Sequence, residues 1–380
     1  MQVHFQLTAI ALLLGASGIS QAALTTTSGP INFTGSASVT AAQDYPNDPY
    51  ASGPKSLTNT NDGASAATVS VARFNAAMGV LTGVDLQLNS NRTQSISGSG
   101  YKGNGEGKTV SGSGASSAAL VAAGAQIPLA PAISLEGGSC SLAMGKTGNI
   151  SCNWGPSTSE ATATHGTASV DSSNLDAYAG TGSVDATLTL PSLSATVTQS
   201  SYKGQASGSS ATYTVDWSGT LQASYSYLLH ALASFDTDAE TTSLTLDFGN
   251  VAQNSTASLN FRLFNLANAD RIGLDLDSVI ASGDAGAFDT GLSAFADLAQ
   301  GGSQSFIANL LTANAGSFSA QYLLNLSDAD FGAGSTRQNY QLTLNLIGNV
   351  TAVPLPGAVW LFGSALLGFV GIGRRKRSLA

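Results

Sequence analysis

Positive charge is scarce in this chain of 380 residues, which has 14 Lys and Arg against 23 Asp and Glu. Four of the 14 lie together near the C-terminus, so the rest of the chain has a formal net charge of −13. Neutralising phosphates requires clustered cations. The composition therefore disfavours nucleic acid and anionic membrane surfaces as partners.

Cysteine is also scarce, with only Cys140 and Cys152 present. The segment between them contains the turn-forming Gly145 and Gly148, so a hairpin could bring the two sulfurs together. A zinc site would need three or four ligands, and the nearest histidine is His165. In an oxidising compartment a disulfide is the favoured state.

Catalytic motifs are missing from the sequence. It contains no Gly-x-Ser-x-Gly elbow and no His-Glu-x-x-His pair, and neither His165 nor His230 has a second histidine nearby. We expect no enzyme activity and no cofactor.

Calcium is the one ligand that paired acidic residues suggest. Asp275 with Asp277, and Asp328 with Asp330, are such pairs, and hard oxygen ligands from loops suit calcium outside the cell. None of them forms an EF-hand loop. The alternative interpretation is that they are solvated acidic loops.

Alternation of apolar and polar residues is the dominant pattern of the chain. This period of two predicts half-buried strands. Clusters of Gly, Asn and Ser separate the segments at short intervals, which favours antiparallel β-sandwiches over alternating strands and helices. The Ser/Gly-rich stretch 95–118 is predicted to be a loop or a glycine-rich edge. The predicted strands are Val84–Leu88, Val184–Leu190, Tyr213–Trp217, Leu221–Tyr227, Leu244–Phe248, Leu259–Leu263, Ala320–Tyr322 and Tyr340–Leu346.

Three aromatic residues, Trp217, Tyr225 and Tyr227, alternate along these strands. Sugar-binding sandwiches often present aromatic rings on one sheet face, so the three are candidate glycan-binding residues. The same positions would also fill a core, which is the alternative for large rings.

The two ends of the chain predict export. Leu7 to Ile19 is a short apolar run followed by small residues, which indicates a cleavable signal peptide over residues 1–22. Val353 to Gly373 has no charge over 21 residues, and a membrane-spanning helix needs roughly 20. Basic residues directly behind it stay on the cytoplasmic side. The body of the protein is therefore expected outside the cytoplasm.

This tail resembles the PEP-CTERM sorting signal of Gram-negative bacteria. The resemblance is carried by a Pro-x-Pro element, an apolar helix containing Trp360-Leu-Phe-Gly-Ser364, and a basic stop-transfer cluster. It implies recognition by an exosortase that cuts near Pro354 to Pro356. Leu355 stands where the family usually has Glu. The sorting motif is Val353, Pro354, Leu355 and Pro356, and the stop-transfer cluster is Arg374, Arg375, Lys376 and Arg377.

Two weaker resemblances lie in the body. The stretch from Val71 to Leu86 is similar to the start of choice-of-anchor β-rich modules, and the stretch from Leu246 to Asn265 is similar to immunoglobulin-like modules of the same broad group. Both imply β architecture and export, and neither implies catalysis.

The sequence thus predicts an all-β chain of antiparallel β-sandwich modules with one C-terminal transmembrane helix. We expect a signal peptide (1–22), a choice-of-anchor-like domain (23–235), an immunoglobulin-like domain (236–350) and a sorting signal (351–380). The expected function is that of an exported structural protein of the cell surface or of a biofilm matrix, with exopolysaccharide as a candidate partner. It would be handled by the Sec machinery, signal peptidase and an exosortase, and held in the inner membrane before processing. The alternative is a carbohydrate-binding adhesin.

Overall fold

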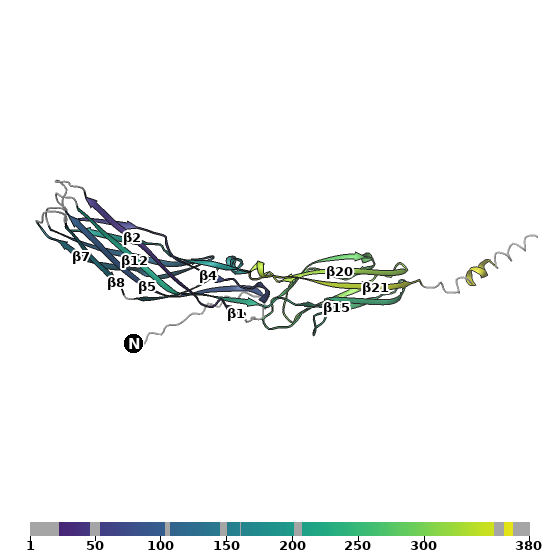
Figure 1. Ribbon diagram of the computed structural model, residues 1–380. Coiled ribbons are helices and arrows are strands. Elements are labelled where there is room, and N and C mark those ends of the chain that lie inside the picture. The colour runs from purple at the N-terminus through teal and green to yellow at the C-terminus, as the bar shows by residue number, and fades with distance from the viewer. Residues whose placement is uncertain are drawn as a thin grey trace, which may run out of the picture. The chain divides into compact units, whose positions relative to one another are not determined.

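A computed structural model describes residues 23–45, 54–102, 107–144, 150–159, 161–200, 207–352 and 361–367. The chain divides into two compact units, Met1–His230 with Asp330–Arg337, and Ala231–Ala329 with Gln338–Ala380. Strands dominate both units (Figure 1), which confirms the all-β prediction. The predicted signal peptide lies outside the described residues.

The first unit consists of two six-stranded sheets. In sheet 1, β12 and β5 pair at the centre, β1 and β2 pair with the other side of β12, and β8 and β9 with the other side of β5. Sheet 1 contains β1 (Leu24–Thr27), β2 (Ile31–Tyr45), β5 (Val80–Lys102), β8 (Ile150–Thr158), β9 (Thr162–Ser169) and β12 (Ser207–Leu228).

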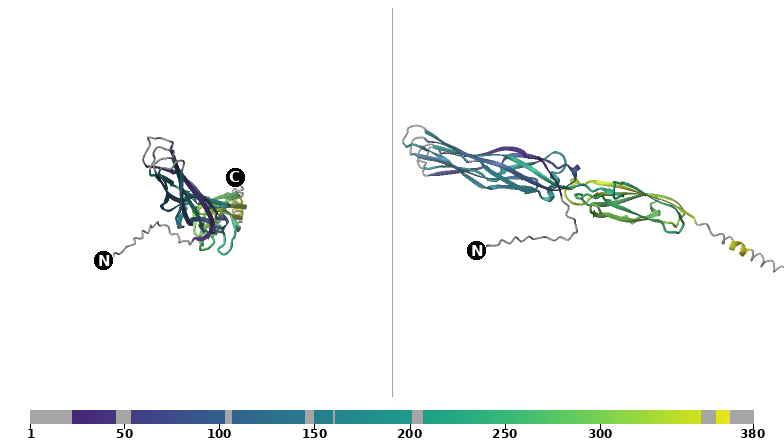
Figure 2. Two further views of the ribbon diagram at one scale, coloured as in Figure 1. Left: turned by 60° about the vertical axis from the view of Figure 1, so that its left-hand side comes forward. Right: turned by 90° about the horizontal axis from the view of Figure 1, so that it is seen from below.

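In sheet 2, β6 is the central strand. It pairs with β7 on one side and with β10 and β11 on the other, and these two pair with β4 and β3. Sheet 2 contains β3 (Lys55–Thr60), β4 (Ala64–Ala72), β6 (Lys108–Ala122), β7 (Ala125–Leu142), β10 (Ser183–Leu190) and β11 (Leu193–Gln199). Figure 2 shows the long strands of this unit running alongside one another.

The core of the first unit lies between its sheets. Along the middle of β5 and β12, buried residues alternate with more exposed ones, as the period of two predicts. The two predicted strands Tyr213–Trp217 and Leu221–Tyr227 are one continuous strand, β12. Inward residues of the two sheets form one hydrophobic cluster that includes Leu86, Leu88, Val110, Leu120, Leu188, Val197, Val215 and Leu221.

The prediction for residues 95–118 was wrong, because the described residues of this stretch form the end of β5 and most of β6, a central strand. Its glycines make room for aromatic rings. A Cβ on Gly98 would lie 2.3 Å from the Trp154 ring, and a Cβ on Gly114 would lie 2.3 Å from the Tyr213 ring. Glycine inside a strand often marks such a close approach.

The second unit has a four-stranded and a five-stranded sheet, called sheets 3 and 4. All their pairings are antiparallel except that of β14 with β21, which is parallel. Sheet 3 has the order β13 (Ala233–Ser234), β15 (Ser258–Asn265), β19 (Ser303–Leu310), β17 (Phe288–Asp289). Sheet 4 has the order β14 (Ser243–Ala252), β21 (Asn339–Thr351), β20 (Gly316–Asp328), β16 (Leu274–Gly283), β18 (Phe295–Leu298).

Helical structure is short wherever the chain is described. Four 3-10 turns join strands, and residues 361–367 are α-helical. None of the described helices has the length and apolar character needed to cross a membrane. Most of the predicted span from Val353 to Gly373 lies outside the described residues, as do the sorting motif and the basic cluster. The 3-10 turns are η1 (Ala76–Met78), η2 (Ser172–Tyr178), η3 (Ala285–Ala287) and η4 (Gly334–Thr336).

Candidate functional site

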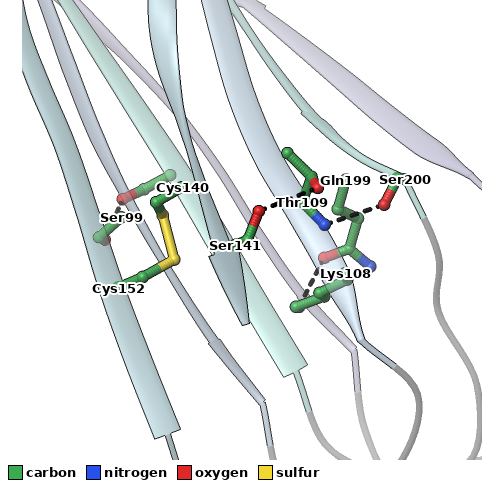
Figure 3. Close-up of a disulfide and its surroundings, with 9 residues drawn as sticks. Ser99, Lys108, Thr109, Cys140, Ser141, Cys152, Gln199 and Ser200 are labelled. Atoms are coloured by element: carbon green, nitrogen blue, oxygen red, sulfur yellow. Dashed lines mark hydrogen bonds between the residues drawn. A yellow bond between two sulfur atoms is a disulfide. The ribbon is translucent and has the colours of Figure 1, made fainter. Parts of the chain in front are cut away.

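A disulfide joins Cys140 and Cys152, as predicted (Figure 3). The two Cα atoms are 5.9 Å apart. The expected hairpin is wrong, however, because β7 pairs with β6 in sheet 2 whereas β8 pairs with β5 in sheet 1. The disulfide therefore links the two sheets of the first unit at one edge, with Trp154 of β8 buried two residues from Cys152.

Two lysines, Lys102 and Lys108, are buried. Lys102 is the last residue of β5 and Lys108 is the first residue of β6. Lys108 Nζ donates a hydrogen bond of 3.0 Å to Oε1 of the fully buried Gln199 (Figure 3). Burial, and then the charge of Lys102, lower the pKa of Lys108 to about 8. No motif predicted this pair, because isolated lysines in a Gly/Ser-rich segment look like exposed residues.

A second cluster of polar side chains lies inside the sandwich, on the inner face of sheet 1. The Tyr213 hydroxyl donates to Gln94 Oε1 and is 3.1 Å from Ser116 Oγ of sheet 2. The guanidinium of Arg92, two residues from Gln94, lies over the Trp217 ring at 5.3 Å from its centroid. Burial raises the pKa of Tyr213, so its phenol is neutral at neutral pH.

The aromatic residues predicted as glycan candidates are mainly core residues. Trp217 and Tyr225 are each 2% exposed, and the Tyr225 hydroxyl donates to the backbone carbonyl of Ala72. Tyr227 is half-buried, with its ring centroid 5.2 Å from that of Phe74. The rings of Trp217 and Tyr225 therefore fill the core and present no open face to a sugar, whereas Tyr227 keeps part of its ring exposed.

The acidic residues predicted as calcium candidates are engaged in structural contacts. Asp328 is 1% exposed and accepts hydrogen bonds from the Ala231 and Gln338 amides and the Tyr340 hydroxyl. Its partner in the predicted pair, Asp330, belongs to the first unit and forms an ion pair with Arg337.

The other predicted pair is likewise engaged. Asp275 accepts from the Asp297 amide and Asp277 from the Ser327 hydroxyl, at 2.6 and 3.1 Å. Within the described ranges, no group of three or more His, Cys, Asp or Glu residues is arranged to hold a metal ion. All four aspartates therefore already accept hydrogen bonds from neighbouring groups of the chain.

A shallow groove of about 490 Å³ lies on the outer face of sheet 1. Asp85 and Gln87 of β5 and Gln222 and Ser224 of β12 line it, and Ser169 of β9 donates to Asp85. Most of the residues that line it are polar, although Leu86 and Ala168 add apolar surface, and no sequence motif pointed to it.

The outer faces of the first unit are covered with hydroxyl groups. Serine and threonine side chains on neighbouring strands lie opposite one another, so their hydroxyls form hydrogen bonds across the sheet. Such pairs are Thr40 with Thr212, Ser56 with Thr198, and Thr58 with Thr196, at 2.7 to 2.9 Å. Ser117 of β6 pairs in the same way with Ser192, just before β11, at 2.7 Å.

No protein-family model matches the chain, and a search of curated proteins found no significant match. Among solved structures, the ASH/PapD-like domain of human CEP192 is similar at 12% identity and a TM-score of 0.22, over 32% of this chain and 87% of that domain. The periplasmic chaperone SfaE is similar at 9% identity and a TM-score of 0.22, over 33% and 62%. Vibrio cholerae VesB protease is similar at 15% identity and a TM-score of 0.21, over 35% and 37%. TM-scores this low carry no argument about fold or function.

Proposed function

We propose that this chain is an exported structural protein of the cell surface or extracellular matrix rather than an enzyme. The observation that carries the proposal is the disulfide between Cys140 and Cys152. Disulfides form and persist in oxidising compartments and are rare in the cytosol. A bond that links the two sheets of the first unit suits a protein that must stay folded outside the cell.

The hydroxyl-covered faces support association with a neutral polymer. A hydroxyl both donates and accepts hydrogen bonds and needs no counter-ion. Exopolysaccharide is itself rich in hydroxyls. Many weak contacts along these faces would hold the protein in such a matrix without a single deep binding pocket.

The proposed route to the surface rests on the sequence of the two ends. Residues 1–22 would direct export through the Sec machinery and be removed by signal peptidase. The segment from Val353 to Gly373 would hold the precursor in the inner membrane, and an exosortase would release it at the Pro-x-Pro element. These steps are supported by the resemblance of the tail to PEP-CTERM signals.

Localisation in the native host tests this proposal. Intact cells are treated with a protease and, separately, with a membrane-impermeant thiol reagent before and after reduction. We expect digestion of the body, and labelling of Cys140 and Cys152 only after reduction. A variant lacking residues 2–22 is the control and should stay inside, protected from the protease. Full-length protein that resists the protease and carries free thiols would refute export.

A second candidate function is glycan binding at the groove on sheet 1. Carboxylate and amide side chains such as Asp85, Gln87 and Gln222 are suitable partners for sugar hydroxyls, and they converge there. If the groove is a specific site, Gln87→Ala with Gln222→Ala should abolish binding to purified exopolysaccharide. Binding that persists in this variant would favour distributed contacts over the hydroxyl faces.

A further inference from the structure

The interior of the first unit contains a cation for which no counter-ion is present among the described residues. Arg92 is 0% exposed, and its Nε, Nη1 and Nη2 atoms are buried without a hydrogen-bond partner. An arginine guanidinium is not deprotonated in proteins, so the charge remains. Burial of such a charge costs several kcal/mol.

The neighbouring aromatic groups do not offset that cost. The Trp217 ring below the guanidinium contributes a cation–π attraction, but a neutral ring does not balance the charge as an anion would. Tyr213 is the other nearby titratable group, and its raised pKa keeps it a neutral phenol rather than an anion. The Arg92 guanidinium therefore needs an anion beside it to offset the cost of its burial.

Two further donors without partners lie at neighbouring positions of the same sheet face. Trp217 pairs directly with Arg92 across β12 and β5, and its Nε1 is buried and has no hydrogen-bond partner. Thr164 of β9 pairs with Ser90, the next inward residue of β5 from Arg92, and Thr164 Oγ1 is also buried without a partner. Guanidinium and indole groups can only donate, so this set needs an acceptor.

We propose that the first unit binds one monatomic anion of the halide class between Arg92, Trp217 and Thr164. A halide accepts from several donors at once without the directional demands of a carboxylate or phosphate. It would neutralise the guanidinium and satisfy the indole and hydroxyl donors together. The stability of the first unit would then depend on halide concentration, independently of whether the chain is exported.

Thermal unfolding of the full chain in sodium bromide and in sodium gluconate at equal ionic strength tests the site. We expect the unfolding midpoint of the first unit, followed by tryptophan fluorescence, to rise with bromide and then saturate, because a ligand that binds only the folded state stabilises it. Arg92→Met should abolish the saturable rise. It should still fold, since replacing a buried charge with an apolar group of similar volume is often tolerated. Arg73→Met, at an exposed arginine of the same unit, is the matched control and should keep the rise.

Two further measurements test the anion site even if Arg92→Met fails to fold. Trp217→Phe keeps an aromatic ring and removes the indole donor, so it should weaken the apparent bromide affinity roughly tenfold. Anomalous diffraction from bromide-soaked crystals should place a peak within hydrogen-bonding reach of the Arg92 guanidinium. An equal response of wild type and Trp217→Phe, or a carboxylate of the chain in that place and no bromide, would overturn the proposal.

Discussion

Gly114 shows at the residue scale what the sequence pattern could not reveal. A Ser/Gly-rich stretch has little hydrophobic periodicity, so it resembled a loop, although β6 is a central strand. The reason for this glycine lies far away in the sequence. Tyr213 of the other sheet occupies the space where a side chain at position 114 would lie. Apolar alternation, by contrast, predicted β10, β12, β14, β15, β20, β21 and the first part of β5, because it depends only on neighbours along the chain.

Replacing Gly114 by Ala should therefore destabilise the first unit. The added methyl would overlap the Tyr213 ring, and overpacking of this kind typically costs about 1 to 3 kcal/mol. Chemical denaturation of the purified chain measures this loss. Gly286→Ala is the control, since nothing lies within 4 Å of its added Cβ, and it should change the free energy of unfolding by less than about 0.5 kcal/mol. Equal effects of the two substitutions would contradict this account.

Lys108 should make stability rise with pH. Its pKa is lowered from 10.5 to about 8 in the folded state, so between these values the unfolded state binds more protons than the folded state. The free energy of unfolding then increases as pH rises, by about 2 to 3 kcal/mol between pH 8 and 10. Denaturant titrations at pH 7, 8, 9 and 10 measure the rise.

Lys108→Met should remove this rise, and Lys55→Met, at an exposed lysine, should keep it. The interval ends at pH 10 because buried Tyr178 and Tyr225 have pKa values raised to about 12. Above pH 10 the folded state holds their protons more tightly than the unfolded state, so their contribution to stability falls. A rise of the same size in Lys108→Met would assign the effect to another group.

At the scale of elements, the short spacing of Cys140 and Cys152 predicted that they meet but not how. Spacing limits the distance between two residues, whereas strand pairing also depends on β5 and β6, which lie elsewhere in the sequence. The strands that contain the two cysteines, β7 and β8, belong to different sheets and do not pair with each other as a hairpin. The parallel pairing of β14 with β21 has the same origin, because strands so far apart in sequence need no hairpin connection.

Loss of the disulfide should weaken the first unit selectively. The bond closes a loop with a sequence separation of 12, which corresponds to about 3 kcal/mol in the chain-entropy model. The Cys140→Ala, Cys152→Ala double variant should therefore lower the unfolding midpoint of the first unit and leave that of the second unit unchanged. Calorimetry of wild type with and without reductant provides the comparison. The double variant itself should not respond to reductant.

At the scale of the whole molecule, the sequence predicted a boundary near residue 236 and a continuous second domain. The chain divides between His230 and Ala231, close to the predicted boundary, and Asp330–Arg337 returns to the first unit. Within that unit, Asp176 accepts hydrogen bonds from the amide and hydroxyl of Ser335, and the Leu81 amide donates to Thr336 Oγ1. No local pattern encodes such a return, because each contact joins residues more than 150 positions apart.

The last prediction concerns the C-terminal tail, whose order of parts suggests a division of roles. Arg374 to Arg377 should halt translocation, and the apolar segment before them should hold the chain in the bilayer. Pro354 and Pro356 should keep the entry to that segment extended, because proline removes a backbone donor and biases the preceding residue away from helix. An extended segment at the outer membrane face is what a protease-like enzyme can bind.

In cells that carry an exosortase, we therefore expect the mature protein to lack everything after about residue 356. Intact-mass measurement on the protein isolated from such cells checks this. Replacing Pro354 and Pro356 by Ala should abolish processing and leave the chain ending at Ala380, because the cleavage segment could then join the helix. Replacing Pro191, which lies between β10 and β11, by Ala is the control and should leave processing intact. A wild-type chain that still ends at Ala380 in such cells would identify the tail as a simple membrane anchor.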